Sequence, residues 1–251
     1  MTKVVIEQGC DVESPREWDN LGTLYVTENR YFVGDQDAPT ADGSLDLRIQ
    51  VLDLEEEVSE LEDELYMKLT TEQDYEHEEA LEAVGSRVRD LVKKRWDADY
   101  SSLPVYHYTH SGTVINTTGF SCPWDSGLCG EIYVSLADAI DNFRDALSKH
   151  NPKGLPFSWD SVVSIDEHGD VTLGMEMSRI LNGEVSTYSD YLSGNVYGFQ
   201  SYEENEDGSW EETGSCWGFY GSDAKENGMT DHLPEAHEFI TREEMNELLA
   251  N

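Results

Sequence analysis

The stretch Asp46–Leu69, DLRIQVLDLEEEVSELEDELYMKL, decides the fold of the middle of this chain. Its apolar residues recur at intervals of three or four, which places them along one side of a helix about three heptads long. We therefore predict a single helix from Asp46 to Leu69, with packing of the coiled-coil type. The apolar residues are Leu47, Val51, Leu54, Val58, Leu61, Leu65 and Leu69.

A second helix is predicted directly after the first. Thr70-Thr71-Glu72-Gln73 fits the capping-box pattern S/T-x-x-E/Q, and an apolar repeat follows from Leu81 to Val92. Acidic residues come early in this repeat and basic residues late, as the helix dipole favours. We predict an antiparallel helical hairpin over residues 46–96, inserted into a core domain formed by residues 1–45 and 97–251.

The apolar stripe of the first helix needs a surface to cover it. An isolated stripe would expose Leu54, Leu61 and Leu65 to water. It can be buried on the parent domain or against a second copy, so a homodimer through the hairpin is one expectation.

Alternating β-branched and aromatic residues elsewhere predict strands and hairpins. With the helices they favour an α+β fold with a mostly antiparallel sheet. Strands are expected at 105–108, 113–116 and 131–134, helices at 136–150, 175–192 and from Thr241, and hairpins at 161–173 and 195–219. The terminal helix should bury Met245, Leu248 and Leu249, and residues 122–127, Cys-Pro-Trp-Asp-Ser-Gly, should form a loop.

The charge is strongly negative and unevenly distributed. With 53 acidic and 16 basic residues the formal net charge is −37. The negative electrostatic field of such a surface disfavours binding to the phosphates of nucleic acid and binding to anionic membranes. No apolar run is long enough to span a membrane, no signal peptide is evident, and the four cysteines are too scattered for a disulfide scaffold, so we expect a cytoplasmic protein with reduced thiols.

Five strings, at residues 14–24, 103–112, 120–127, 191–199 and 215–221, resemble a family of phage and archaeal-virus proteins. The resemblance implies a non-structural viral protein made in the cytoplasm of the infected host. The chain departs from the family pattern at Thr109, where the family has Asp, and at Leu128-Cys129, where it has Gln-Val. Cys129 is therefore not expected to be a functional thiol of the family.

Reactive side chains gather in these strings. The candidate catalytic residues are His110, Cys122, Asp125 and Cys216, where a histidine base would activate a thiol and a carboxylate would orient the imidazole. No local catalytic signature accompanies them, and a polar loop packed under Trp and Gly is the simpler interpretation. His107, His110, Cys122 and Cys129 could also ligate zinc, but their spacing does not match a structural site, so no metal and no cofactor are predicted.

The acidic helix provides the main functional hypothesis. Eight carboxylates over twelve residues give about one charge per 2.3 Å of helix, close to the density of duplex DNA. The predicted partner is a host protein that handles nucleic acid, such as a defence enzyme, which the carboxylates would occupy as a DNA mimic. Two alternatives are a viral enzyme using the candidate catalytic residues, and adaptation of the surface to molar salt in a halophilic host. The predicted binding residues are Asp53, Glu55, Glu56, Glu57, Glu60, Glu62, Asp63 and Glu64, with the aromatic residues Trp124 and Trp217.

Overall fold

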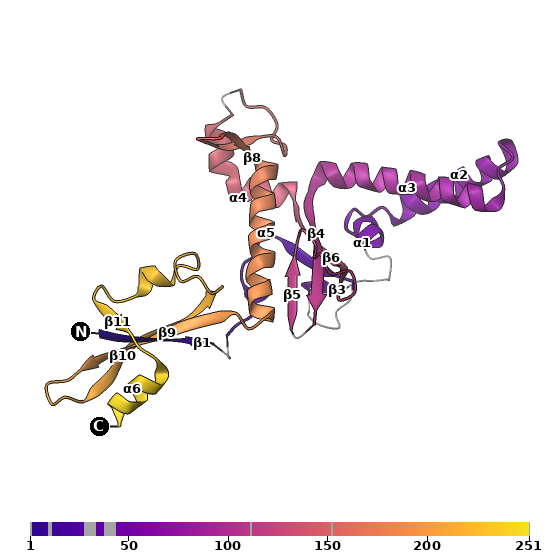
Figure 1. The fold of residues 1–251 in the computed structure, drawn as a ribbon. Helices are drawn as coiled ribbons and strands as arrows, with labels where there is room; N and C mark the ends of the chain where they lie inside the picture. The colour runs from indigo at the N-terminus through magenta and orange to yellow at the C-terminus, as the bar shows by residue number, and fades with distance from the viewer. Residues whose placement is uncertain are drawn as a thin grey trace. The chain divides into compact units, whose positions relative to one another are not determined.

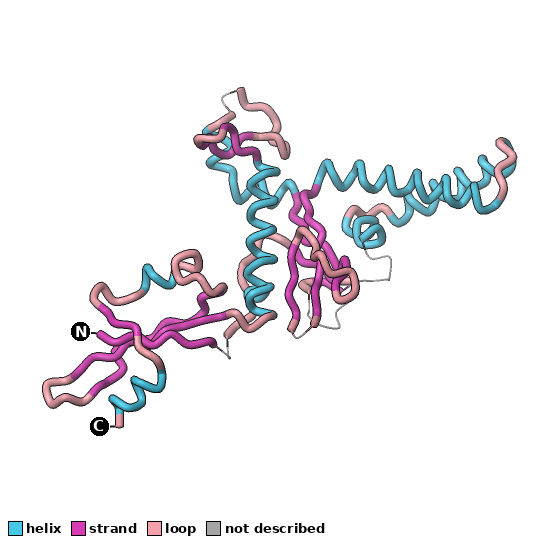
Figure 2. Tube along the Cα trace, viewed as in Figure 1, coloured by secondary structure: helices cyan, strands magenta, loops and turns pink. Residues whose placement is uncertain are grey.

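The computed structural model describes residues 2–9, 12–27, 34–37, 44–110, 112–151 and 153–250. Its helices and mostly antiparallel sheets form the predicted α+β fold (Figures 1 and 2). Among the helices in these ranges, none combines the length and the apolar character that a membrane crossing requires.

Contacts divide the chain into two compact units. The first unit contains residues 1–19, 108–116 and 184–251, and the second contains residues 20–107 and 117–183. Residues of the expected core domain contribute to both units, and the helical hairpin belongs to the second.

The elements of each unit are as follows. The first unit holds β1 (Thr2–Gln8), η1 (Pro15–Glu17), β5 (Thr113–Asn116), β9 (Val196–Glu204), β10 (Trp210–Tyr220), η2 (Met229–His232), β11 (His237–Phe239) and α6 (Arg242–Leu249). The second unit holds β2 (Thr23–Val26), β3 (Gln36–Asp37), α1 (Ser44–Val51), α2 (Glu55–Glu72), α3 (His77–Asp99), β6 (Ser126–Ser135), α4 (Leu136–Lys149), β7 (Val162–Asp166) and β8 (Gly169–Thr172). Two elements, β4 (Tyr100–Thr109) and α5 (Leu173–Leu192), contribute residues to both units.

The sheet of the first unit has the strand order β10-β9-β1-β11. Strand β1 lies inside the sheet, antiparallel to β9 and parallel to β11. One face packs Val4 against Phe199, and the other packs Val5 against Met245 of α6. Sequence reasoning did not predict β1, although its pairing with β9 and β11 brings the first residues of the chain beside its C-terminal part.

Helix α6 begins as predicted. The hydroxyl of Thr241 accepts from the backbone N–H of Glu244, and the Glu244 carboxylate accepts from the backbone N–H of Thr241. Met245 is fully buried, as expected, but Leu249 is 46% exposed, so its assignment to the buried face was wrong.

The second sheet has the order β3-β2-β6-β4-β5, and β2 pairs antiparallel with β6. The predicted helix at 136–150, helix at 175–192 and hairpins at 161–173 and 195–219 are all confirmed within a few residues. Ser126 and Gly127 begin strand β6 and are therefore not part of a loop.

The predicted single helix from Asp46 to Leu69 is wrong, because the chain breaks between α1 and α2. Asp53 adopts a left-handed conformation with φ of 54°. The N–H of Leu54 donates to the carbonyl of Ile49 at 2.9 Å, and the N–H of Asp53 donates to Gln50 at 3.1 Å. This pair of hydrogen bonds is a Schellman motif, in which Asp53 takes the place usually held by glycine.

The predicted capping box at Thr70-Thr71-Glu72-Gln73 is also wrong. Thr70 and Thr71 lie in the last turn of α2, where their hydroxyls donate backward to the carbonyls of Tyr66 and Met67 at 2.9 and 2.6 Å. A hydroxyl bonded to a preceding carbonyl is not available to cap a following helix. Helix α3 instead begins at His77 after a turn containing Asp74, which has a φ of 58°.

Helices α2 and α3 form the predicted hairpin (Figure 1). They share a hydrophobic core. Leu54 is buried, and Leu61 and Leu65 pack against the same cluster. Helix α3 therefore covers the stripe that motivated a homodimer, and burial of these leucines no longer requires a second copy. The buried members are Leu54, Val58, Leu69, Ala80, Val84, Val88 and Val92.

Candidate functional site

The outer surface of the hairpin carries the predicted binding carboxylates. All eight, from Asp53 to Glu64, are exposed, because the apolar positions of α2 face α3 and leave the acidic positions toward solvent. Seven of them belong to α2 itself, within residues 55–64. Over ten residues this gives about one charge per 2.1 Å of helix axis.

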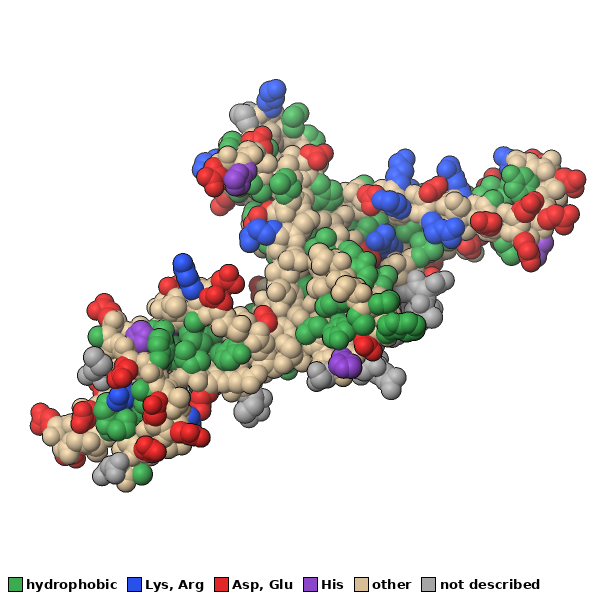
Figure 3. Space-filling model, in the orientation of Figure 1, with side chains coloured by type: hydrophobic (Ala, Val, Ile, Leu, Met, Phe, Trp, Pro, Cys, Tyr) green, Lys and Arg blue, Asp and Glu red, His purple; other side chains and the backbone are tan. Residues whose placement is uncertain are grey.

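The acidic surface continues around the end of the hairpin. Residues 60–82, here called the hairpin tip, contain ten Asp or Glu and one basic residue, Lys68. Every one of these ten acidic residues is exposed. Figure 3 shows the carboxylates gathered at this end of the hairpin.

The opposite end of α3 is basic. Five exposed cationic side chains lie there: Arg87, Arg89, Lys93, Lys94 and Arg95. Figure 3 shows Lys and Arg side chains along the hairpin between its acidic end and the rest of the second unit. Arg95 lies 3.5 Å from Glu57 of α2, and Lys93 pairs with Asp97. The negative charge of α2 is thus partly compensated near its start, at Glu57, whereas the ten acidic residues of the hairpin tip are accompanied by one basic residue, Lys68.

The candidate catalytic residues fall in different units. His110 and Cys216 belong to the first unit, and Cys122 and Asp125 belong to the second. The thiol of Cys122 lies 3.8 Å from Oδ2 of Asp125, so the structure brings these two together. Ser111, which follows His110 in the string at residues 103–112, lies outside the described residues. A catalytic site using His110 stays a prediction.

The imidazole of His107 lies near the loop that holds Cys122 and Asp125, and all three residues belong to the second unit. A Cβ placed on Gly127 would lie 3.5 Å from His107 Nε2. The histidine ring therefore rests against the start of β6, two residues after Asp125. Sequence reasoning considered His107 as a zinc ligand or, preferably, as a half-buried strand residue, and the structure shows it half-buried. Nothing in its spacing from Cys122 indicates its proximity to the loop.

The described residues give no support to the zinc alternative. Cys129 is buried, and its thiol donates to the carbonyl of Val105 at 3.2 Å. Within the described ranges, no group of three or more His, Cys, Asp or Glu side chains is placed to hold a metal ion. Cys129 serves the packing between β4 and β6.

The two tryptophans predicted to bind differ in their surroundings. Trp124 is 91% exposed in the loop before β6. Trp217 is 43% exposed on β10, and its indole lies against Gly198 of β9, where an added Cβ would stand 2.2 Å from the ring. Only Trp217 is held in a fixed position by the sheet.

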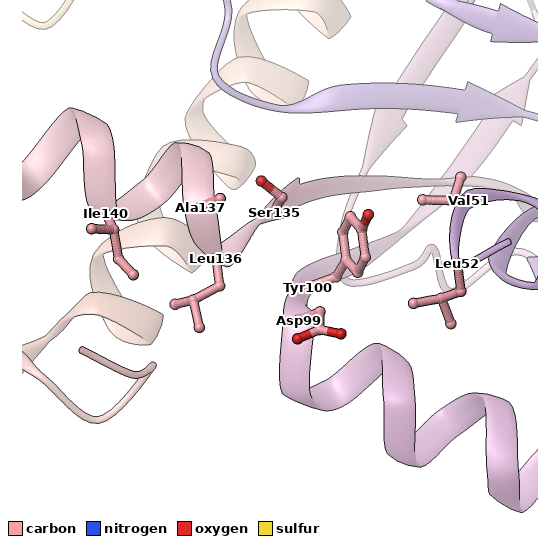
Figure 4. Close-up of a pocket in the computed structure, with 8 residues that line it drawn as sticks. All are labelled: Val51, Leu52, Asp99, Tyr100, Ser135, Leu136, Ala137 and Ile140. Atoms are coloured by element: carbon pink, nitrogen blue, oxygen red, sulfur yellow. The ribbon is translucent and has the colours of Figure 1, made fainter. Parts of the chain in front are cut away.

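A hollow at the root of the hairpin was not predicted from the sequence (Figure 4). Its walls are the end of α1 and the start of α4, with the junction of α3 and β4 between them. Burial raises the pKa of the Tyr100 phenol, and the negative charges of Asp99 and Asp138 raise it further. The lining residues are Val51, Leu52, Asp99, Tyr100, Ser135, Leu136, Ala137 and Ile140.

Comparisons with known proteins identify no family for this chain. No protein-family model, no curated protein and no solved structure matches the chain. The class that the fold and surface define is an α+β protein with a protruding, acidic helical hairpin.

Proposed function

We propose that this protein acts by binding, and that its hairpin tip occupies the basic, nucleic-acid-binding surface of a partner protein. The partner class is a host enzyme that handles or defends against foreign nucleic acid, and the setting is the cytoplasm of a host infected by a phage or an archaeal virus. The observation that carries the proposal is the exposure of ten carboxylates at the tip beside a single lysine.

The spacing of the charges supports mimicry of a phosphate backbone. One carboxylate per about 2.1 Å along residues 55–64 of α2 approaches the one charge per about 1.7 Å of duplex DNA. The core between α2 and α3 holds these charges on a packed scaffold, so a partner meets them in a fixed arrangement. The cationic side chains at the basic end of α3 offset part of the negative charge of α2, so the negative electrostatic field of the hairpin is strongest at the tip.

A competition assay tests the proposal with two variants of equal charge. The test variant replaces the tip residues Glu60, Glu62, Glu64 and Glu72 with glutamine, and the control replaces four glutamates of the β9–β10 hairpin. All eight positions are exposed. The control positions are Glu203, Glu204, Glu206 and Glu211.

The assay measures displacement of labelled duplex DNA from a panel of purified DNA nucleases at low salt. We expect the wild-type protein and the control to displace DNA from at least one nuclease, and the test variant to need at least ten times more protein. Equal potency of the two variants would show that net charge, and not the hairpin, is responsible. Failure of the wild type on the whole panel would count against mimicry.

A second candidate explains the total charge without a partner. Acidic side chains are also exposed throughout the first unit, for example at Glu203, Glu206 and Asp207, and the chain has few lysines. Such a surface suits molar salt, where self-repulsion is screened. Thermal unfolding at about 0.1 M and about 3 M salt separates the two: a halophilic protein gains many degrees in high salt, whereas an equal melting temperature removes this explanation.

A further inference from the structure

Helix α3 carries a stripe of charged and small residues on its exposed side, here called the α3 stripe. Neighbours along the stripe are three or four positions apart, with the pair Gly85-Ser86 at its centre, so they lie on one side of the helix. An added Cβ on Gly85 would stand 3.3 Å from Nη1 of Arg89, which shows that these two residues share that side. The charged members are exposed, whereas the apolar positions of α3 are buried against α2. The α3 stripe consists of Glu78, Glu82, Gly85, Ser86, Arg89 and Lys93.

The α3 stripe is complementary in charge to a second copy of itself. A twofold axis between Gly85 and Ser86 places a second α3 antiparallel to the first. Glu78 and Lys93 are equally far from this axis along the helix, and so are Glu82 and Arg89. In a contact with twofold symmetry, each residue meets its counterpart twice. Every glutamate of the stripe therefore lies opposite a cation of the other copy.

The charges of the α3 stripe are not balanced within one chain. Glu78 and Glu82 are four positions apart, as are Arg89 and Lys93, and like charges at this spacing destabilise a helix. In the described part of the chain, Glu78, Glu82 and Arg89 form no ion pair, and Lys93 pairs with the exposed Asp97. The helix dipole acts within the first and last turns, so it does not account for Glu82 or Arg89 in the interior of α3. A second copy supplies the opposite charges.

The glycine at the centre of the stripe suits the close approach of another helix. Glycine is the least favourable residue after proline in the interior of a helix. The Arg89 side chain alone comes within 4 Å of a Cβ placed on Gly85, so packing within the described chain does not require glycine there. A second backbone can approach closely at this point. Leu81, one turn earlier, is 50% exposed and would be partly covered by the same contact.

The charge of the whole chain does not prevent this contact. The stripe has no net charge, because it holds two glutamates, one arginine and one lysine, whereas α2 carries eight acidic residues and one lysine. Two copies repel each other because each has a net charge of −37, but salt at about 0.15 M screens that repulsion beyond about 8 Å. The copies can therefore meet through α3 and leave the carboxylates of α2 exposed.

We propose that two copies of this chain associate through their α3 stripes, antiparallel about a twofold axis between Gly85 and Ser86. Glu78 then pairs with Lys93 of the second copy, and Glu82 pairs with Arg89 of the second copy. Exposed ion pairs each contribute little, so the dimer is weak and reversible. The contact does not use the apolar positions of α2, which are buried within one chain. It is also independent of the partner proposed for the hairpin tip, because the glutamine variant that tests that proposal leaves the α3 stripe unchanged.

Sedimentation velocity of the full chain at about 0.15 M salt tests the proposal by charge reversal. The wild type should dimerise with a Kd below about 0.5 mM. Glu82→Arg and Arg89→Glu should each weaken the dimer at least tenfold, because each places like charges opposite one another. The double variant Glu82→Arg/Arg89→Glu exchanges the two charges, keeps the net charge, and should dimerise within threefold of the wild type.

A matched control separates the stripe from net charge. Arg87→Glu changes the net charge as Arg89→Glu does, at an exposed position two residues away that lies outside the stripe, and should leave the Kd within threefold of the wild type. Gly85→Leu should weaken the dimer at least tenfold by adding a side chain at the axis.

Three results would overturn the proposal. The first is a wild type that is monomeric at about 0.5 mM. The second is equal association of the wild type and the two single charge reversals. The third is a double variant that is as weak as the single variants although its melting curve shows that it is folded, because the two positions would then not face each other.

Discussion

Replacing Trp96 with alanine should loosen the helical hairpin from the sheet of the second unit. Trp96 is 1% exposed, stacks on Tyr100 at 4.4 Å and meets Tyr133 edge-on at 5.3 Å. The guanidinium of Arg48 lies 4.9 Å from the ring, and the indole N–H donates to Ser102 at 3.1 Å. Because α3 runs directly into β4 at this point, the indole anchors the hairpin.

The size of the effect follows from these contacts. Truncating a buried tryptophan to alanine costs about 3–5 kcal/mol, including the cavity it leaves. Aromatic pairs add about 0.5–1.5 kcal/mol each beyond the buried area, and the lost hydrogen bond adds about 1 kcal/mol. Since these contributions overlap, we expect a loss of about 4–6 kcal/mol in the free energy of unfolding, or roughly 10–20 °C in melting temperature.

Urea unfolding followed by far-UV circular dichroism measures this loss. Trp124→Ala is the matched control, because Trp124 is 91% exposed and its removal should change stability by less than about 0.5 kcal/mol. The reasoning would be refuted by a loss below about 1 kcal/mol for Trp96→Ala, or by equal losses for the two variants.

Three further predictions concern the first unit. The Arg242 hydrogen bond lowers the pKa of Glu7, so it contributes stability above the unfolded pKa of about 4.3 that is lost as the pH falls through the folded pKa. The gap in unfolding free energy between wild type and Arg242→Gln should therefore narrow below about pH 4, and a gap that widens in acid would contradict this. Gly198→Ala should cost about 1–3 kcal/mol and shift tryptophan fluorescence, because its methyl group displaces the Trp217 indole; unchanged stability and emission would show that the indole is not packed tightly on Gly198. Thr241→Ala should cost about 1 kcal/mol by removing the capping box of α6, as measured by thermal melting, and a neutral effect would argue against the cap.

The spacing of apolar residues predicts which segments form helices more accurately than it predicts where those helices begin and end. The spacing of Leu54, Val58, Leu61 and Leu65 matches one face of a helix, and the structure buries that face against α3. The break at Asp53 was missed because aspartate keeps the apolar spacing intact and occupies a left-handed position that usually signals glycine.

A single sequence does not predict which strands pair when they lie far apart along the chain. Residues 1–7 were examined only for a signal peptide, so the place of β1 beside β9, far along the chain, was not inferred. The indole of Trp217 lies against Gly198, and Glu7 stands in the same cross-strand row. Both positions depend on strand register, which a single sequence does not specify. The exposure of the tip carboxylates was predictable, because it depends only on helix periodicity.

The potency of the two charge-matched glutamine variants in displacing duplex DNA from a nuclease is the most direct measurement of the hairpin's role. The account predicts that the variant altered at Glu60, Glu62, Glu64 and Glu72 loses at least tenfold in potency, while the variant altered in the β9–β10 hairpin stays within twofold of the wild type. Equal potency of the two variants would contradict it.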